Sequence, residues 1–219
     1  MRAISIRDFF DKKEVVEGYT GEWNASDVNF KIINSLHTKK SVLSLGCGAG
    51  REVKALVAKG LRVTAIDISE NMIKRSREIE AAAKYFCEDA VDFAKNNKNQ
   101  LKFDYIIGLF SLLNYIKKKE RREFVENLYN MLNKKWKIIF EVRRFDDAKF
   151  SDILKAFIAP FFALFFGQIK NYEIGDVWCR EVGSWKTWTC SHLLTQNQLK
   201  KLFKGFKFTI NKTQVCLEK

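Results

Sequence analysis

The stretch VLSLGCGAGRE, residues 42–52, joins a short apolar strand to a helix through three glycines spaced G-x-G-x-G. Glycines at such a turn let the chain fold back tightly and let a ligand approach the backbone at the helix N-terminus. The dinucleotide fingerprint G-x-G-x-x-G requires a glycine where this chain has Arg51, which weakens a nicotinamide interpretation. A glycine-rich turn alone is a weak signal, so the flanking segments decide the interpretation.

Short apolar runs alternate with amphipathic stretches from Lys40 onward, and this alternation is typical of a parallel sheet with helices on both faces. The expected strands are residues 42–45, 61–66, 84–87, 103–110 and 136–142, and the expected helices are residues 52–59, 69–79 and 120–132. Thr195 and Gln198 have the spacing of a capping box and predict one more helix, followed by strands at 206–210 and 213–217. The predicted fold is α/β, a doubly wound, Rossmann-like, mostly parallel seven-stranded sheet with helices on both faces.

The alternation stops after the fifth strand. An aromatic-rich apolar segment at residues 157–166 indicates a buried or interfacial element. A hairpin is expected at residues 177–182 and 185–193, turning at Gly183 and Ser184. We interpret this part of the chain as a small lid-like insertion.

Two carboxylates follow the next two strands of the predicted sheet. Asp67 ends the second strand about 20 residues beyond the glycine turn, where a carboxylate can accept both hydrogen bonds of a ribose diol. Asp89 follows the third strand and can accept a hydrogen bond from an exocyclic amine such as that of adenine. Three neighbouring strand ends therefore carry groups that suit a nucleoside ligand.

These segments resemble successive motifs of the class I S-adenosylmethionine-dependent methyltransferases. The resembling stretches are residues 42–52, 63–69 with Met72, 88–90 and 103–116, within a match over residues 42–142. The resemblance implies a methyltransferase whose cofactor is S-adenosyl-L-methionine. The cofactor-binding residues that it implies are Tyr19, Gly46, Cys47, Gly48, Gly50, Asp67, Ile68, Met72, Asp89, Ala90 and Leu109.

The resemblance also assigns parts of the cofactor to these residues. The glycine turn would surround the methionine portion, Asp67 would bind the ribose and Asp89 the adenine amine. Ile68 and Met72 would flank the adenine ring. The backbone near Leu109 would contact the cofactor's amino group, and Tyr19 resembles an aromatic residue that closes over the cofactor in many relatives. One position departs from the family pattern, because the acidic residue common two positions before the glycine turn is Ser44 here.

Methyl transfer from a sulfonium is an in-line displacement, so the positioning of donor and acceptor can supply much of the acceleration. An amine or hydroxyl acceptor can still need a base near the carboxyl edge of the sheet. Our catalytic candidates are His192, after the hairpin, and Glu141 and Arg143, at the end of the fifth strand. His37 precedes the first strand, at the opposite edge, and is not a candidate. Lysines at residues 117–119 would make the active edge basic, which suits an acidic acceptor.

Composition indicates which partners and which cellular compartment suit the chain. The 39 Lys and Arg against 26 Asp and Glu give a net charge of +13, which fits nucleic acid, an anionic membrane, an acidic substrate or only a lysine-rich surface. Five cysteines without a C-x-x-C pair favour reduced thiols in the cytoplasm and indicate no metal site. We recognise no secretory signal, and no apolar run reaches the roughly 20 residues that a transmembrane segment needs.

The chain has 219 residues, 47% of them hydrophobic, which fits one methyltransferase domain spanning residues 1–219. Its expected parts are N-terminal cap helices at 1–39, the cofactor-binding core at 40–144, the lid and substrate insertion at 145–194, and a final helix and strands at 195–219. We predict methyl transfer to a small-molecule acceptor, because the insertion is compact and no nucleic-acid-binding module is appended.

Three alternatives stay open, and so does the oligomeric state. An RNA (tRNA or rRNA) methyltransferase fits the charge, although the Asn-Pro-Pro-Tyr pattern of base-amine methyltransferases is lacking. A lipid-directed methyltransferase would rest residues 157–166, with Lys155 and Lys170, on an anionic membrane. A cofactor-binding regulatory protein would show no turnover. Four aromatic residues of the insertion can shape a lid or stack on a base: Tyr172, Trp178, Trp185 and Trp188.

Overall fold

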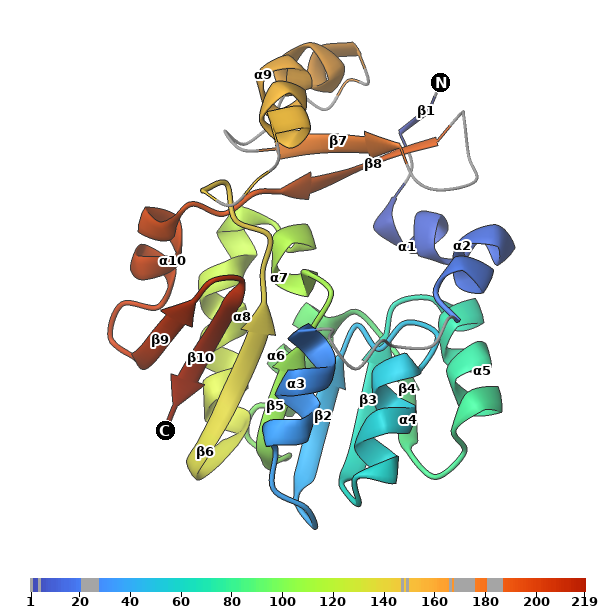
Figure 1. The fold of residues 1–219 in the computed structure, drawn as a ribbon, viewed down its shortest axis with the longest axis vertical. Helices are drawn as coiled ribbons and strands as arrows, with labels where there is room; N and C mark the ends of the chain where they lie inside the picture. The colour runs from blue at the N-terminus through green and yellow to red at the C-terminus, as the bar shows by residue number, and fades with distance from the viewer. Residues whose placement is uncertain are drawn as a thin grey trace.

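The computed structural model describes residues 2–3, 5–20, 28–146, 148, 150–165, 167, 176–180 and 187–219. Seven strands form one sheet in the order β4-β3-β2-β5-β6-β10-β9 (Figure 1). In that order the strands are Lys84–Cys87, Arg62–Asp67, Ser41–Leu45, Phe103–Gly108, Leu132–Glu141, Gln214–Glu218 and Lys207–Asn211. Neighbours are parallel except β10, which is antiparallel to both β6 and β9. The predicted doubly wound, mostly parallel sheet is confirmed.

Helices cover both faces of this sheet, because its central strands are buried and apolar on both sides. One layer contains α3 (Val28–Ser35), α4 (Arg51–Ala58) and α5 (Glu70–Ile79). The other contains α6 (Ala90–Asn97), α8 (Lys118–Met131) and α10 (Gln196–Leu202). Thr195 caps α10 through the predicted capping box with Gln198. Each layer buries its own apolar core against the sheet.

The strand order reverses between β2 and β5. The chain leaves β2 towards β3 and β4 on one side, then returns to build β5 and β6 on the other. In open α/β sheets, ligands bind at the carboxyl ends of the strands beside such a reversal. β5 ends at Gly108, two residues before its predicted end, because Phe110 and Ser111 adopt φ values of 51° and 63° and lead into α7 (Leu112–Tyr115).

A second sheet of three strands lies over the carboxyl ends of the first (Figure 1). Its order is β1-β8-β7, with bounds Arg2–Ala3, Thr187–His192 and Asp176–Arg180. β7 and β8 are antiparallel, as the predicted hairpin requires. The turn predicted at Gly183 and Ser184 lies outside the described residues. β1 pairs parallel with β8 and was not predicted, because two residues leave no periodic pattern.

The outer layer above this small sheet is α9 (Phe150–Phe165). Its small residues Ala156, Ala159 and Ala163 are buried, and the helix contacts β7. Seven of its large apolar side chains are exposed, so the element expected to be buried or interfacial at residues 157–166 is buried on one face only. Within the described residues, no helix is long and apolar enough to cross a membrane.

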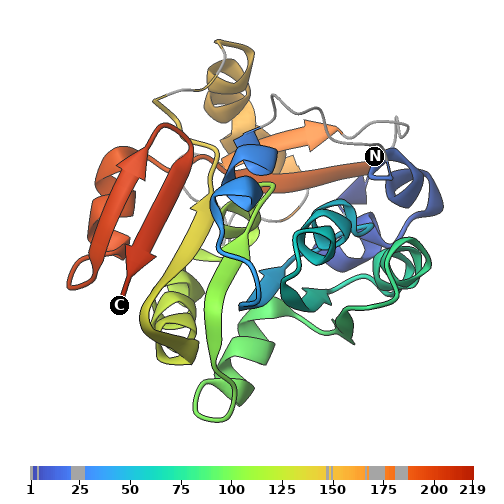
Figure 2. The ribbon, with the colours of Figure 1, turned by 60° about the horizontal axis from the view of Figure 1, so that its bottom comes forward.

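The N-terminal helices α1 (Ile6–Phe10) and α2 (Lys13–Gly18) pack beside α5, at the side of the molecule opposite β9 and β10 (Figure 2). Phe9 is fully buried and belongs to the same apolar cluster as Met72 of α5. The Asp11 carboxylate accepts hydrogen bonds from the Ser69 hydroxyl at 2.8 Å and the Asn71 N–H at 2.9 Å. These contacts hold the N-terminal helices beside the carboxyl end of β3.

Candidate functional site

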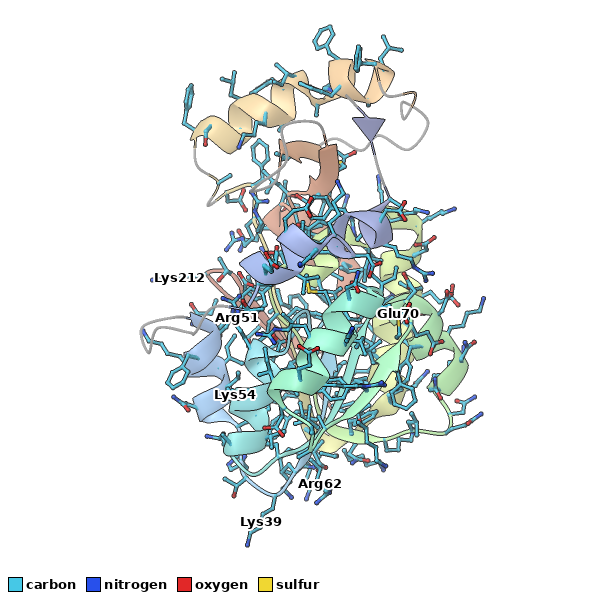
Figure 3. The ribbon with its side chains drawn as sticks, turned by 90° about the vertical axis from the view of Figure 1, so that its right-hand side faces the viewer. Lys39, Arg51, Lys54, Arg62, Glu70 and Lys212 are labelled. Carbon is cyan, nitrogen blue, oxygen red and sulfur yellow. The ribbon has the colours of Figure 1, made fainter. Side chains whose placement is uncertain are left out.

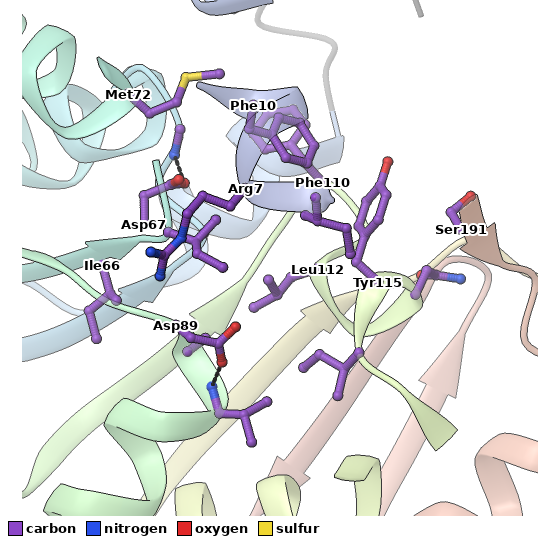
Figure 4. Close-up of a pocket in the computed structure, with 18 of the residues that line it drawn as sticks. Arg7, Phe10, Ile66, Asp67, Met72, Asp89, Phe110, Leu112, Tyr115 and Ser191 are labelled. Atoms are coloured by element: carbon purple, nitrogen blue, oxygen red, sulfur yellow. Dashed lines mark hydrogen bonds between the residues drawn. The ribbon is translucent and has the colours of Figure 1, made fainter. Parts of the chain in front are cut away.

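A pocket of about 690 Å³ lies between the carboxyl ends of the large sheet and the small sheet (Figure 4). Its wall includes the turn after β2, the ends of β3 and β4, and parts of α1, α7 and β8. Sites for small ligands and cofactors typically enclose roughly 300–1,000 Å³. The pocket therefore lies where the strand reversal predicts a ligand and has the size of a small-molecule site.

The glycine turn forms one wall of the pocket. Gly46 and Gly48 have φ values of 67° and 52°, which glycine adopts without strain. A Cβ on Gly48 would meet no atom within 4 Å, so its backbone faces open space. Cys47 also lines the pocket, and burial raises the pKa of its thiol well above the usual value. Gly50 precedes α4 and does not line the pocket.

Asp67 lines the pocket at the end of β3 and binds the glycine turn (Figure 4). One carboxylate oxygen accepts the N–H of Gly48 at 2.8 Å, and the other accepts the N–H of Ser69 at 2.9 Å. Burial raises the pKa of Asp67, and these backbone N–H groups oppose the rise. Because each carboxylate oxygen has two lone pairs, both can accept a further hydrogen bond from a ligand diol.

The other predicted cofactor residues line the same pocket. Asp89 caps α6, with Oδ1 accepting the N–H of Val91 at 2.8 Å, and accepts no hydrogen bond at Oδ2 from the described chain. That oxygen can accept from an amine of a ligand. The remaining lining residues of the predicted set come from five segments: Tyr19, Ile68, Met72, Ala90 and Leu109. The structure thus brings together every predicted cofactor residue except Gly50.

Glu52 lines the pocket and was not predicted. It lies in the first turn of α4, only 2% exposed, and its carboxyl accepts a hydrogen bond from the Ser44 hydroxyl at 3.0 Å. Burial is the main cause that raises its pKa to about 8. In the sequence Glu52 is an ordinary acidic residue near a helix start, and only the contact with Ser44 distinguishes it.

His192, the first catalytic candidate, lines the pocket and is 3% exposed. Its Nδ1 lies 3.0 Å from Oδ1 of Asp176, and its Nε2 lies 3.2 Å from the side-chain nitrogen of Gln198. The Gln198 amide oxygen accepts the N–H of Thr195, so its nitrogen is the donor to His192. The ring therefore donates from Nδ1 to Asp176 and accepts at Nε2.

Glu141 and Arg143, the other catalytic candidates, do not line the pocket. Both backbone groups of Arg143 bond the buried side chain of Asn114, whose Oδ1 accepts the Arg143 N–H at 3.0 Å. The Asn114 amide also donates to the carbonyl of His192. Asn114 lines the pocket and connects α7 with the segment after β6 and with β8, a link across about 80 residues of sequence that no local pattern predicts. Of the predicted basic edge, Lys117 lines the pocket and residues 118–119 begin α8.

Aromatic residues from the N-terminal helices and α7 complete the wall. The Phe10 ring lies 6.0 Å from the Tyr19 ring and 5.7 Å from the Tyr115 ring, edge to face in both pairs. Arg7 of α1 also lines the pocket (Figure 4). Neither Arg7 nor Phe10 was predicted, although the Ser5 cap on Asp8 marks this helix start in the sequence.

Part of the predicted lid lies outside what the structure describes. Tyr172 and Trp185 are outside the described residues, and only the backbone is described for Trp178 and Trp188. Lys170 is also outside. Among the described side chains, no group of three His, Cys, Asp or Glu residues could hold a metal ion.

Comparison by sequence finds methyltransferases similar to part of the chain. Residues 43–135 match the family described as a methyltransferase domain. An uncharacterized methyltransferase of Geobacillus sp. (strain WCH70) is 29% identical over 143 residues, which are 64% of this chain and 65% of that protein. Across three curated relatives the aligned segments span 42%, 51% and 65% of the relative, so the chain spans about half their length.

Solved structures share the fold over more of the chain. A SAM-dependent methyltransferase from Methanosarcina mazei superposes with a TM-score of 0.64 at 20% identity, covering 85% of this chain and 94% of its own. The magnesium protoporphyrin IX methyltransferase from Synechocystis PCC 6803, solved with bound SAH, gives a TM-score of 0.62 at 15% identity and covers 97% and 95%. At these identities the superpositions establish a common fold.

Proposed function

We propose that this protein is a class I S-adenosylmethionine-dependent methyltransferase and that it transfers a methyl group from S-adenosylmethionine to a small-molecule acceptor; the methyltransferase-domain match and the shared fold support this proposal. One observation carries the proposal: the turn after β2, Asp67 at the end of β3 and Asp89 after β4 line one pocket at the strand reversal. Their hydrogen-bonding groups suit the methionine portion, the ribose and the adenine amine of this cofactor.

The lining residues fit such a cofactor. The open space at Gly48 lets a ligand approach the backbone, and Asp67 is oriented by two backbone N–H groups. Met72 and Ile68 supply apolar wall on the same side. When bound, S-adenosylmethionine supplies a methyl group on a sulfonium, which needs no protonation of the leaving group. The protein's task is therefore to position the cofactor and acceptor and to exclude water.

Calorimetric titration with S-adenosylmethionine and S-adenosylhomocysteine tests this proposal, with NADH as the comparison. We expect saturable binding of the first two ligands and none of NADH, because Arg51 stands where the dinucleotide fingerprint needs glycine. Preference for NADH, or failure of both adenosyl ligands to bind, would contradict it. Binding without product from a broad acceptor panel would indicate the regulatory alternative.

A small acceptor is supported by how the pocket is covered. The small sheet and α9 lie above it, with Ser191 and Ala163 in its wall. Lys117 and Arg7 also line it, and these cations favour an acceptor that carries an acidic group. One structural neighbour is named for a small acceptor, magnesium protoporphyrin IX. Lys39 and Arg62 lie at the end of the molecule opposite α9 (Figure 3), and neither of these cations lines the pocket.

We propose His192 as the base that accepts a proton from the acceptor. Its bond from Nδ1 to Asp176 orients the ring, but Nε2 must exchange Gln198 for the acceptor. Glu141 and Arg143 would act as positioning residues from the end of β6. We expect His192→Asn to lower kcat at least tenfold while leaving S-adenosylhomocysteine affinity within twofold. Equal losses in binding and turnover would instead indicate a structural role.

A lipid acceptor is the second candidate, and α9 favours it. Seven large apolar side chains of this helix are 41% to 80% exposed. They are Phe150, Leu154, Phe157, Ile158, Phe161, Leu164 and Phe165. An amphipathic helix of this kind binds in the interface of a bilayer, and the net charge of +13 favours an anionic one. The buried face of the same helix reaches the pocket at Ala163, which would bring a lipid headgroup close to the site.

Liposome flotation tests this role of α9. We expect the protein to float with vesicles rich in phosphatidylglycerol, and the double variant Phe157→Ser/Phe161→Ser to lose most of that binding. Phe86→Ser, at an exposed phenylalanine on β4, is the matched control and should float like the wild type. A wild-type protein that stays with the unbound fraction at low salt would rule out the lipid candidate. Concentration-dependent dimerisation in place of flotation would assign the face to a second copy.

The cytoplasm is the location that we propose. Cys47, Cys87 and Cys216 are free thiols. Free thiols are typical of reducing compartments. Recovery of the native protein in a membrane-free cytoplasmic fraction would support this location.

A further inference from the structure

Glu52 is a buried carboxyl group in the wall of the cofactor pocket. It lies beside the glycine turn, and Ser44 donates a hydrogen bond to it at 3.0 Å. Ser44 stands two positions before the turn, on β2, and is itself fully buried. A carboxyl group therefore occupies the space next to the end of β2, although it comes from α4 and not from the strand.

The groups around Glu52 leave its charge uncompensated. Asp67 from β3 is an acidic group that disfavours a negative charge on Glu52. Arg51 favours the charged form of Glu52, and its guanidinium lies over the Phe110 ring, 4.7 Å from the ring centroid. In the described chain no cationic side chain forms an ion pair with Glu52. Burial with these neighbours raises the pKa of Glu52 to about 8, so the free protein holds it mostly neutral at pH 7.

The other buried carboxylates of the pocket accept hydrogen bonds from N–H groups of the protein. Asp67 accepts two backbone N–H groups, and Asp176 accepts from His192. Glu52 has the Ser44 hydroxyl as its side-chain partner. A buried acid that lacks a cation becomes charged when a ligand supplies one, because the new ion pair offsets the loss of hydration.

We propose that Glu52 binds the ammonium group of the cofactor's methionine portion and gives up its proton to solvent as the ligand binds. This inference rests on the proposed function, because it requires an aminoacyl-bearing nucleoside in the pocket. No covalent bond changes in the step: the carboxylic acid loses one proton, and the ligand ammonium keeps its own. Ser44 and Glu52 together then supply the acidic group that Ser44 alone lacks.

The proposal predicts linkage between pH and affinity. A group that is mostly protonated in the free protein at pH 7 and ionised in the complex releases roughly one proton per ligand bound. The affinity should therefore rise about tenfold for each pH unit between 6 and 7 and level off above the pKa of about 8. A ligand without the ammonium group should show neither effect.

Calorimetry in two buffers tests the proposal on wild-type protein. S-adenosylhomocysteine and its deaminated analogue, which differ in the ammonium group alone, are titrated at pH 7 in phosphate and in Tris. Because the buffers differ in ionisation enthalpy, the difference in heat measures the protons released. We expect about one proton for S-adenosylhomocysteine, none for the analogue, and at least tenfold tighter binding of the first.

Two variants complete the test. Glu52→Gln keeps the size of the side chain but cannot ionise, so proton release should vanish and the two ligands should bind within threefold of each other. Glu70→Gln, an exposed acid in the first turn of α5, is the control and should behave like the wild type. Binding of S-adenosylhomocysteine without proton release in the wild type would overturn the inference alone. Failure of both ligands to bind would overturn the proposed function and this inference with it.

Discussion

Replacement of Asp67 by asparagine is expected to weaken S-adenosylhomocysteine binding by roughly 100-fold. The carboxylate accepts the N–H groups of Gly48 and Ser69 with its two oxygens, at 2.8 and 2.9 Å. An asparagine has one oxygen, so its NH₂ group would face one of these donors. The variant therefore loses both an acceptor for the ribose and part of the frame that holds the glycine turn and the start of α5 together.

Titration with two ligands locates this effect. Adenosine lacks the methionine portion, so an equal fold-loss for adenosine and S-adenosylhomocysteine would place the lost contact at the nucleoside. Asp92→Asn, at a carboxylate of the first turn of α6, is the matched control and should change neither affinity. Thermal melts of both variants report whether folding is affected. Affinity within twofold of the wild type in a folded Asp67→Asn protein would refute our placement of the ribose.

The sheet and its cofactor edge were predictable because their signals are local. Strand β4 has the predicted bounds, and the capping box of Thr195 and Gln198 begins α10 as expected. The glycine turn, Asp67 and Asp89 each follow a strand, and parallel strands bring their carboxyl ends to one edge. A motif that depends on neighbours in sequence and on the direction of a strand can be recognised without knowing the packing.

The rest of the site depends on contacts between distant segments. Arg7 and Phe10 reach the pocket because Phe9 packs in the cluster of Met72 and Asp11 binds the start of α5, and neither contact has a periodic pattern. Glu52 of α4 accepts a hydrogen bond from Ser44 of β2, and this contact is recognised only when the positions of the strand and the helix are known.

The catalytic candidates show a second reason why part of the site could not be predicted from the sequence. A position at the carboxyl end of a strand fixes the edge of the sheet but not the direction of the side chain. Glu141 and Arg143 lie at the correct edge and outside the pocket lining, whereas Asn114 from α7 occupies the space between β6 and β8. His192 lines the pocket because β8 crosses above the large sheet.

Gly50→Ala is expected to lower the free energy of unfolding by about 3 kcal/mol, although Gly50 does not line the pocket. Its φ of 92° strains any residue with a side chain. An added Cβ would also lie 2.4 Å from the Ser76 hydroxyl oxygen and 2.9 Å from the Ser76 Cα. Because the second atom belongs to the backbone of α5, a rotamer change cannot relieve the contact and α4 and α5 must separate.

Gly60→Ala separates the two causes. Gly60 has a φ of 82°, similar to that of Gly50, but a Cβ there would meet no atom within 4 Å. This control should therefore lose only the conformational part, about 1 kcal/mol. Urea unfolding of the two variants measures both values, and equal losses would contradict a role of Gly50 in helix packing. Asp67 accepts the N–H of Ser69, the N-cap of α5, so a shift of α5 should disturb Asp67. Gly50→Ala should therefore also weaken S-adenosylhomocysteine binding, whereas Gly60→Ala should leave it unchanged.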